Sequence, residues 1–159
     1  MKQPVFEGVA TALVTPFQSS TVDYPKLEQL LDFQLASGVD AIVVCGTTGE
    51  AATMTPQEQL GVIAHCIRYV AGRCKVIAGT GSNSTAHCLE TSRVAASIGA
   101  DALLLVTPYY NKCTQAGLIA HYLSVADAVN IPVILYNVPS RTGVDISVDT
   151  YRVLAEHPN

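Results

Sequence analysis

Two side chains with useful chemistry stand at the end of the apolar run 132–135. Tyr136 closes the run, and Arg141 follows in a polar turn that ends at Gly143. A tyrosine hydroxyl can give or take a proton, and a guanidinium offers a rigid, two-pronged donor to a carboxylate. The pattern therefore indicates a site for an acidic small molecule. The alternative is a tyrosine hydroxyl in water and an arginine on a solvated loop.

Polar, hydroxyl and small residues also follow the other apolar runs of the chain. They are found at 15–16, 46–50, 79–83 and 107–111. The segment 79–83 lacks the third glycine and the Lys-Ser/Thr pair of a phosphate-binding loop, so a tight strand-to-helix turn is the better interpretation.

The elements that must position these residues alternate between strand and helix. Apolar runs without polar alternation predict buried strands within 8–17, 40–46, 75–81, 101–108 and 132–138, the last buried on both faces. Helical periodicity and capping residues predict helices over 24–37, 55–70, 84–99, 115–129 and 147–157. The second helix has the clearest start, with Thr55 as cap, Pro56 next and Glu58 at the third position.

An internal repeat supports a parallel sheet. Residues 37–44 and 99–105 both read as a glycine helix stop, an aspartate and an aliphatic run. A closed barrel and a doubly wound sheet both fit this repeat. Because polar residues follow every strand instead of gathering at one crevice, we expect an α/β fold of the TIM (β/α)8 barrel type. The chain supplies roughly five of the eight units, so we expect residues 1–159 to be the N-terminal part of a single barrel domain, with the first and fifth strands as open edges.

Composition limits the classes of function. Of the 159 residues 49% are hydrophobic and 14% charged, which argues against disorder. No apolar run is long enough to span a bilayer, and the start of the chain lacks the apolar block of a signal peptide, so we expect no membrane partner. A net charge of −4 without a basic stripe argues against nucleic acid. Five cysteines without pairing or ligand spacing indicate reduced thiols in the cytoplasm, and four widely separated histidines give no metal site.

Three of the post-strand motifs resemble one enzyme family. They are Gly46-Thr47-Thr48-Gly49-Glu50, Pro108-Tyr109-Tyr110-Asn111 and Tyr136-Asn137-Val138-Pro139-Ser140-Arg141-Thr142-Gly143. In order and spacing the whole chain is similar to the pyruvate-dependent class I aldolases, which include N-acetylneuraminate lyase and dihydrodipicolinate synthase. Arg141 in its Ser-Arg-Thr-Gly context favours the synthase branch.

The resemblance implies an activity for the full-length protein. Members of the synthase branch bind pyruvate as a Schiff base on a barrel lysine, without a cofactor. They condense it with L-aspartate 4-semialdehyde to give 4-hydroxy-tetrahydrodipicolinate, in lysine and diaminopimelate biosynthesis. By resemblance, Tyr136, Thr47 and Tyr110 form a proton relay, with Tyr136 as the acid/base. Tyr110 would reach a neighbouring subunit's site across a tight dimer, within a homotetramer built as a dimer of dimers.

The same resemblance assigns the substrate-binding groups. Gly46 and Thr48 would hold the pyruvate carboxylate, and Arg141 would hold the semialdehyde carboxylate. The family's Schiff-base lysine would lie on a sixth strand, after Asn159. Lys2, Lys26, Lys75 and Lys112 are poorly placed substitutes, so we expect the 159-residue piece alone to be inactive.

Two other functions remain open. One is a sister aldolase that cleaves N-acetylneuraminate or a keto-deoxy sugar acid, and the other is a part-barrel without catalysis that binds pyruvate-like ligands. A further expectation concerns feedback: Pro56, Gln59 and His87 stand where the family's lysine-inhibited members carry two histidines and a glutamate, while Asn83 and Tyr109 are kept. We therefore expect weak or absent inhibition by lysine.

Overall fold

The computed structural model describes residues 3–159 and is organised around one curved parallel sheet. Its strands lie side by side in chain order, and each neighbouring pair is parallel. They are β1 (Ala10–Ala12), β4 (Ala41–Val44), β5 (Lys75–Gly79), β6 (Ala102–Val106) and β7 (Val133–Tyr136). Strands in unbroken chain order have no switch point, which excludes the doubly wound arrangement and confirms the predicted barrel-type α/β units.

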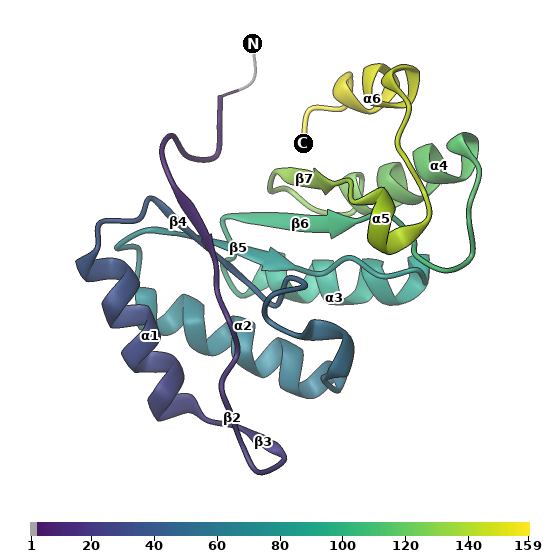
Figure 1. Ribbon diagram of the computed structural model, residues 1–159. Coiled ribbons are helices and arrows are strands. Elements are labelled where there is room, and N and C mark those ends of the chain that lie inside the picture. The colour runs from purple at the N-terminus through teal and green to yellow at the C-terminus, as the bar shows by residue number, and fades with distance from the viewer. Residues whose placement is uncertain (1–2) are drawn as a thin grey trace.

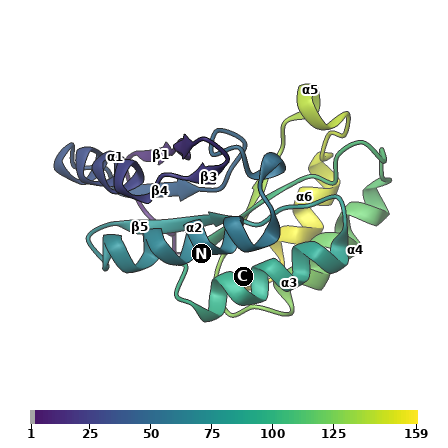
Figure 2. The ribbon, with the colours of Figure 1, turned by 90° about the horizontal axis from the view of Figure 1, so that it is seen from below.

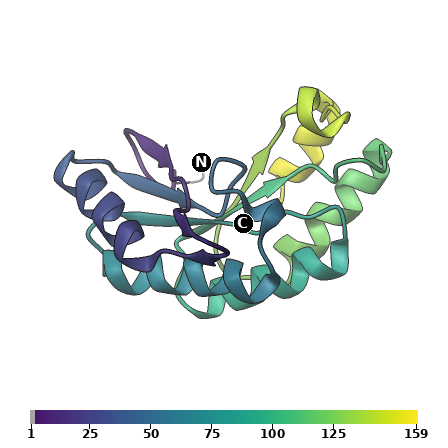
Figure 3. The ribbon, with the colours of Figure 1, turned by 60° about the horizontal axis from the view of Figure 1, so that its bottom comes forward.

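The helices cover one face of this sheet. They are α1 (Tyr24–Ala36), α2 (Pro56–Val70), α3 (Thr85–Ser97) and α4 (Gln115–Ala126). They follow the convex side of the curved sheet in chain order (Figures 1 and 3). The last helix, α6 (Val148–Ala155), packs beside α4 (Figure 2). The loops at the carboxyl ends of the strands are thereby collected at one end of the sheet.

The main core lies between the sheet and the helices. Ile42 and Leu105 are fully buried there with Leu31 of α1 and Ile63 of α2. A smaller cluster on the concave face contains Ala41, Ile77 and Ala102. Burial on both faces explains why the central strands read as continuous apolar runs instead of alternating ones.

The fifth strand differs from its prediction. All four residues of β7 are half-buried instead of buried on both faces. Among residues 3–159, β7 pairs only with β6 and β1 only with β4, so both are edge strands of the sheet, as predicted. The apolar run does form a strand, but its residues stay partly exposed to solvent because no strand of the described residues pairs with its second edge.

Helix starts are well predicted, and some helix ends are not. Thr55 and Glu58 form a capping box, with Glu58 N–H donating to Thr55 Oγ1 at 3.2 Å and Thr55 N–H donating to Glu58 Oε2 at 2.8 Å. Helix α4 ends at Ala126, before the predicted 129, and α6 ends at Ala155, before the predicted 157.

Three short elements are absent from the prediction: the hairpin β2 (Phe17–Gln18) and β3 (Thr21–Val22), the 3-10 turn η1 (Ala51–Thr53) and the helix α5 (Pro139–Thr142).

The repeated aspartates have the same role at the amino ends of two strands. Asp40 precedes β4 and accepts from the N–H of Val9 at 2.8 Å. Asp101 precedes β6 and accepts from the N–H of Val76 at 2.9 Å. Each carboxylate binds a backbone donor at the amino end of the neighbouring strand, Val9 just before β1 and Val76 in β5, so the internal repeat has a structural role. Within residues 3–159 no helix is long and apolar enough to cross a membrane.

Candidate active site

A cavity of about 520 Å³ opens at the carboxyl ends of β4, β5, β6 and β7. Its volume is in the range of sites for small molecules. Leu104 and Val106 give it an apolar wall. The polar side chains on its lining include Thr47, Glu50, Ser82, His87, Tyr109, Tyr136 and Arg141. The two loops that carry most of these groups follow β4 and β7.

The loop after β4 is held in a strained, defined shape. Cys45 and Glu50 both have left-handed backbones, with φ of 54° and 58°. Between them, the N–H of Gly49 donates to Gly46 O and the N–H of Glu50 donates to Thr47 O, both at 3.1 Å. The loop is fixed from outside by the buried hydroxyl of Thr15, which donates to Gly49 O at 2.8 Å. Thr47 is thus presented to the cavity by a rigid turn.

Two glycines allow the end of β5 to lie close to the ends of β4 and β6. A Cβ on Gly79 would overlap the carbonyl of Cys45, and a Cβ on Gly81 would overlap the backbone N of Val106. Neither backbone can move aside, so only glycine fits at either position. The carbonyl of Gly79 also accepts from the buried amide of Gln59 at 2.9 Å. The segment 79–83 is therefore a close-packed turn, as predicted.

The loop after β7 brings Tyr136 and Arg141 to the same cavity. Tyr136 ends the strand and is half-buried, and Arg141 lies on α5. Within residues 3–159 neither the Tyr136 hydroxyl nor the Arg141 guanidinium has a hydrogen-bond or ion-pair partner. Both groups are free to bind a ligand.

Four of the six predicted site residues line this cavity, and two do not. Gly46, Thr47, Tyr136 and Arg141 lie on its wall. Thr48 is exposed outside it, so its role in binding the pyruvate carboxylate stays a prediction.

Tyr110 is not brought to the other relay residues within this chain. It is 88% exposed, with a left-handed φ of 72°, on the loop after β6. Its predicted role needs a second subunit, and it too stays a prediction.

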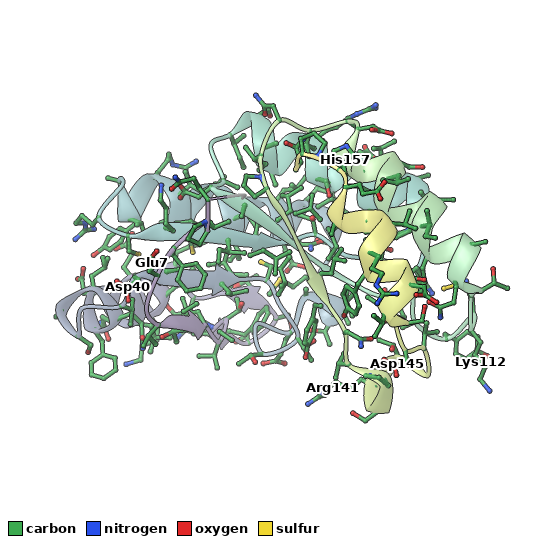
Figure 4. All side chains as sticks on the ribbon, turned by 90° about the horizontal axis from the view of Figure 1, so that it is seen from above. Glu7, Asp40, Lys112, Arg141, Asp145 and His157 are labelled. Atoms are coloured by element: carbon green, nitrogen blue, oxygen red, sulfur yellow. The ribbon has the colours of Figure 1, made fainter. Side chains whose placement is uncertain are left out.

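The lysines of the described residues all lie away from the cavity lining. Lys26 on α1 donates to Gln29 at 3.0 Å, and Lys75 pairs with Asp101 at 2.8 Å at the amino end of β5. Lys112 is exposed on the loop after β6, at the same end as Arg141 (Figure 4). Lys2 lies outside the described residues.

The sequence reasoning gave Glu50 and His87 no part in catalysis or substrate binding. Glu50 belongs to the motif after β4, and its left-handed backbone shows how the loop turns it to the cavity. His87 stands at a position linked to lysine feedback, and it lines the same cavity together with Pro56, Gln59 and Tyr109. The feedback prediction is untested, but the buried amide of Gln59 is already bonded to Gly79.

Cys45 is a cavity residue that is unsuited to covalent chemistry. Burial, and to a smaller extent neighbouring Cys66, raises its pKa to about 12, so it is a neutral thiol at ordinary pH. All five cysteines are free, and three of them are buried. Among residues 3–159 no group of three or more His, Cys, Asp or Glu side chains is arranged to hold a metal ion.

Comparison with known proteins agrees with this arrangement. The sequence model of the dihydrodipicolinate synthetase family matches residues 5–159. The 4-hydroxy-tetrahydrodipicolinate synthase of Thermoanaerobacter sp. (strain X514) is 54% identical over 154 residues, which are 97% of this chain and 52% of that protein. The synthase of Exiguobacterium sibiricum is 56% identical over 156 residues, which are 98% of this chain and 53% of that protein.

Solved structures give the same result. The crystal structure of dihydrodipicolinate synthase from Aquifex aeolicus has a TM-score of 0.94 and 51% identity, covering 95% of this chain and 52% of that one. The Acinetobacter baumannii enzyme, solved with pyruvate, has a TM-score of 0.93 and 51% identity, covering 96% of this chain and 53% of that one. The chain spans about half the length of the curated relatives it matches.

Proposed function

Because the chain belongs to the dihydrodipicolinate synthetase family, we propose that its full-length protein condenses pyruvate with L-aspartate 4-semialdehyde to give 4-hydroxy-tetrahydrodipicolinate. The observation that carries the proposal is the meeting of Thr47, Tyr136 and Arg141 on one cavity, from the loops after two non-adjacent strands. The product belongs to lysine and diaminopimelate biosynthesis, which we place in the cytoplasm.

The two loops divide the work between the two substrates. The loop after β4, with Gly46, Thr47 and Thr48, takes the pyruvate carboxylate on its backbone N–H and hydroxyl donors. Arg141 takes the semialdehyde carboxylate in a bidentate contact. Its unpaired guanidinium supports this role, because no internal carboxylate has to be displaced first.

Tyr136 is the proposed acid/base. Proton transfers are needed when pyruvate condenses with an amine and again when the new carbon–carbon bond forms. Tyr136 projects from a strand, so its position is set by the β6–β7 ladder, in which it pairs with Val106. Thr47 passes the proton on, and Tyr110 of a second subunit completes the relay in a homo-oligomer.

The amine itself must come from outside the described residues, because no lysine among residues 3–159 lines the cavity. The test is borohydride reduction of the full-length protein in the presence of pyruvate, followed by intact mass measurement and peptide mapping. We expect one pyruvate adduct, on a lysine outside residues 3–159. An adduct on Lys112 would require a different site geometry, and absence of any adduct would refute the Schiff-base chemistry.

Arg141 separates the synthase from a sister aldolase. The full-length protein should condense pyruvate with L-aspartate 4-semialdehyde and should leave N-acetylneuraminate and keto-deoxy sugar acids uncleaved. Arg141→Ala should lower kcat/KM for the semialdehyde by about 10²-fold, as loss of a charged hydrogen-bond pair does, and should leave pyruvate trapping intact. Cleavage of a sugar acid by the wild-type protein would instead favour the sister activity.

A further inference from the structure

The loop that carries Arg141 is closed by the side chain of Asn137. Asn137 follows β7 directly, and its Nδ2 donates to the carboxylate Oδ1 of Asp145 at 2.7 Å. Its Oδ1 accepts from the backbone N–H of Ile146 at 3.2 Å. One amide side chain thus joins the strand end to the far end of the loop and uses both its donor and its acceptor.

A second side chain ties the same loop to the helix layer. Gln115 is the first residue of α4, and its Nε2 donates to the carbonyl of Asp145 at 2.8 Å. Its Oε1 accepts from the N–H of Ser147 at 3.0 Å and from the hydroxyl of Thr150 at 2.7 Å. Asp145 is therefore held from two sides, by the strand end and by α4.

Arg141 depends on this frame because its own side chain is not anchored. Its guanidinium has no partner among residues 3–159. Its backbone lies in α5, a helix of four residues, which is too short to be stable by itself. The position of α5 is set by β7 on one side and the Asn137–Asp145 contact on the other, together with the buried Thr142, whose hydroxyl donates to the carbonyls of Val138 and Val144. Figure 4 shows Arg141 and Asp145 on this one loop, away from Glu7 and Asp40.

We propose that Asn137 and Asp145 are positioning residues that fix Arg141 in the cavity and thereby set the affinity for the carboxylate of the second substrate. The inference rests on the function proposed above. Neither residue lines the cavity, so neither is a substrate ligand in this structure. The loop after β4 is fixed separately, by Thr15 and its own turns, so the two halves of the site can be disturbed one at a time.

Asn137→Asp in the full-length protein tests this directly. The change keeps the size of the side chain and the acceptor for Ile146, and it replaces the donor to Asp145 by a second carboxylate. We expect KM for L-aspartate 4-semialdehyde to rise about tenfold or more, as expected when a substrate clamp is misplaced. KM for pyruvate and the yield of borohydride trapping should change by less than about twofold, since the β4 loop is untouched.

Exchanging the amide of Asn137 and the carboxylate of Asp145 should rescue the single variant. In the double variant Asn137→Asp/Asp145→Asn, the amide of residue 145 donates to the carboxylate of residue 137, so the contact is restored with its direction reversed. We expect the semialdehyde KM to return to within about twofold of wild type. Asp149→Asn is the matched control, because it removes one exposed carboxylate that is bonded, among residues 3–159, to Arg152.

Each outcome decides the inference. A selective rise in semialdehyde KM with rescue supports positioning. An unchanged KM, or an equal rise for both substrates together with a lower Tm, overturns it in favour of a purely structural contact. If Asn137→Asp does not fold, Asp145→Ala removes the acceptor without adding charge and is scored in the same way. A wild-type protein that fails to condense the two substrates refutes the proposed function, and the inference falls with it.

Discussion

The two ends of the parallel sheet differ in how some of their polar side chains are bonded. At the amino ends, Asp40 and Asp101 each accept a backbone N–H from a neighbouring strand, and Asp101 also pairs with Lys75. At the carboxyl ends, the Tyr136 hydroxyl and the Arg141 guanidinium have no partner within residues 3–159. Satisfied polar groups stabilise the fold, whereas unsatisfied ones with access to a cavity are available to a ligand.

Backbone strain follows this division only in part. Cys45, Glu50, Tyr110 and Lys112 are non-glycine residues with positive φ, and all four lie in loops that follow strands. At the amino end the left-handed position beside Asp40 is taken by Gly8, which adopts it without the Cβ penalty. Ser19 in the β2–β3 hairpin and Ala71, which ends α2 ahead of β5, also have positive φ, so four of the six such non-glycine residues among 3–159 lie in the loops after β4 and β6.

The largest effect is expected from a change at the carboxyl ends of the strands, at Tyr136. Tyr136→Phe should lower kcat of the full-length protein by about 10²–10⁴-fold, the usual contribution of a general acid/base. Its Tm should stay unchanged, because the lost hydroxyl has no partner among the described residues. Steady-state kinetics and differential scanning calorimetry measure the two quantities.

Tyr69→Phe is the matched control for that variant. Tyr69 lies on α2, and its hydroxyl donates to Asp32 at 2.9 Å. Removing it should lower the stability only slightly, because the bond is exposed to solvent, and should leave kcat intact. A Tyr136→Phe enzyme with normal kcat would remove Tyr136 from the mechanism.

A smaller effect is expected at the amino ends, on stability instead of rate. Gly8 has φ of 118°, and a Cβ there would overlap the carboxylate of Asp40. Gly8→Ala should therefore strain the backbone and displace Asp40 from Val9, at a cost of about 2–4 kcal/mol. Urea unfolding of the full-length protein measures this loss, and the activity per folded molecule should be preserved.

Gly38→Ala measures the part of this stability loss that comes from backbone strain alone. Gly38 also has positive φ, at 75°, but its Cβ would meet nothing within 4 Å. Its cost should be about 1 kcal/mol, the strain of a left-handed alanine alone. Equal losses for the two variants would show that the Asp40 contact adds nothing.

The sequence predicted the regular part of this fold because periodicity and capping are local signals. The capping box at Thr55 and the five apolar runs each lie within a short window, and each was found where expected. The open edges predicted at the first and fifth strands are confirmed, but the prediction that β7 is buried on both faces is wrong, because an edge strand lacks a neighbour on one side. The hairpin β2–β3 and the helix α5 are too short to produce a period.

The candidate site was predicted for a different reason. Thr47, Tyr136 and Arg141 were identified from motifs, and the cavity brings them together. The contact of Asn137 with Asp145 has no such signal, since it spans a loop without periodicity. Nor do the residues themselves show that Gly79 is required by the carbonyl of Cys45, because that approach exists only once β4 and β5 are paired.

The smallest effect is expected from a change at the amino ends, at Lys75. This change separates the two bonds that Asp101 makes, to the Lys75 side chain and to the Val76 N–H. Lys75 donates to Asp101 Oδ1, and this hydrogen bond together with the negative charge raises the pKa of Lys75. Its side chain is 51% exposed, so Lys75→Met should cost less than about 1 kcal/mol in urea unfolding at pH 7.

The effect of Lys75 should also depend on pH in one direction. A raised pKa in the folded state means that the contribution is fully present below the ordinary lysine pKa of about 10.4 and is lost as the pH rises through the folded value. The stability difference between wild type and Lys75→Met should therefore be constant from neutral pH to about 10 and should vanish above that window. The bond from Val76 N–H to Asp101 Oδ2 does not involve Lys75 and should hold the strand end in both proteins. A difference that persists at high pH would assign the effect to packing of the lysine stem instead of its charge.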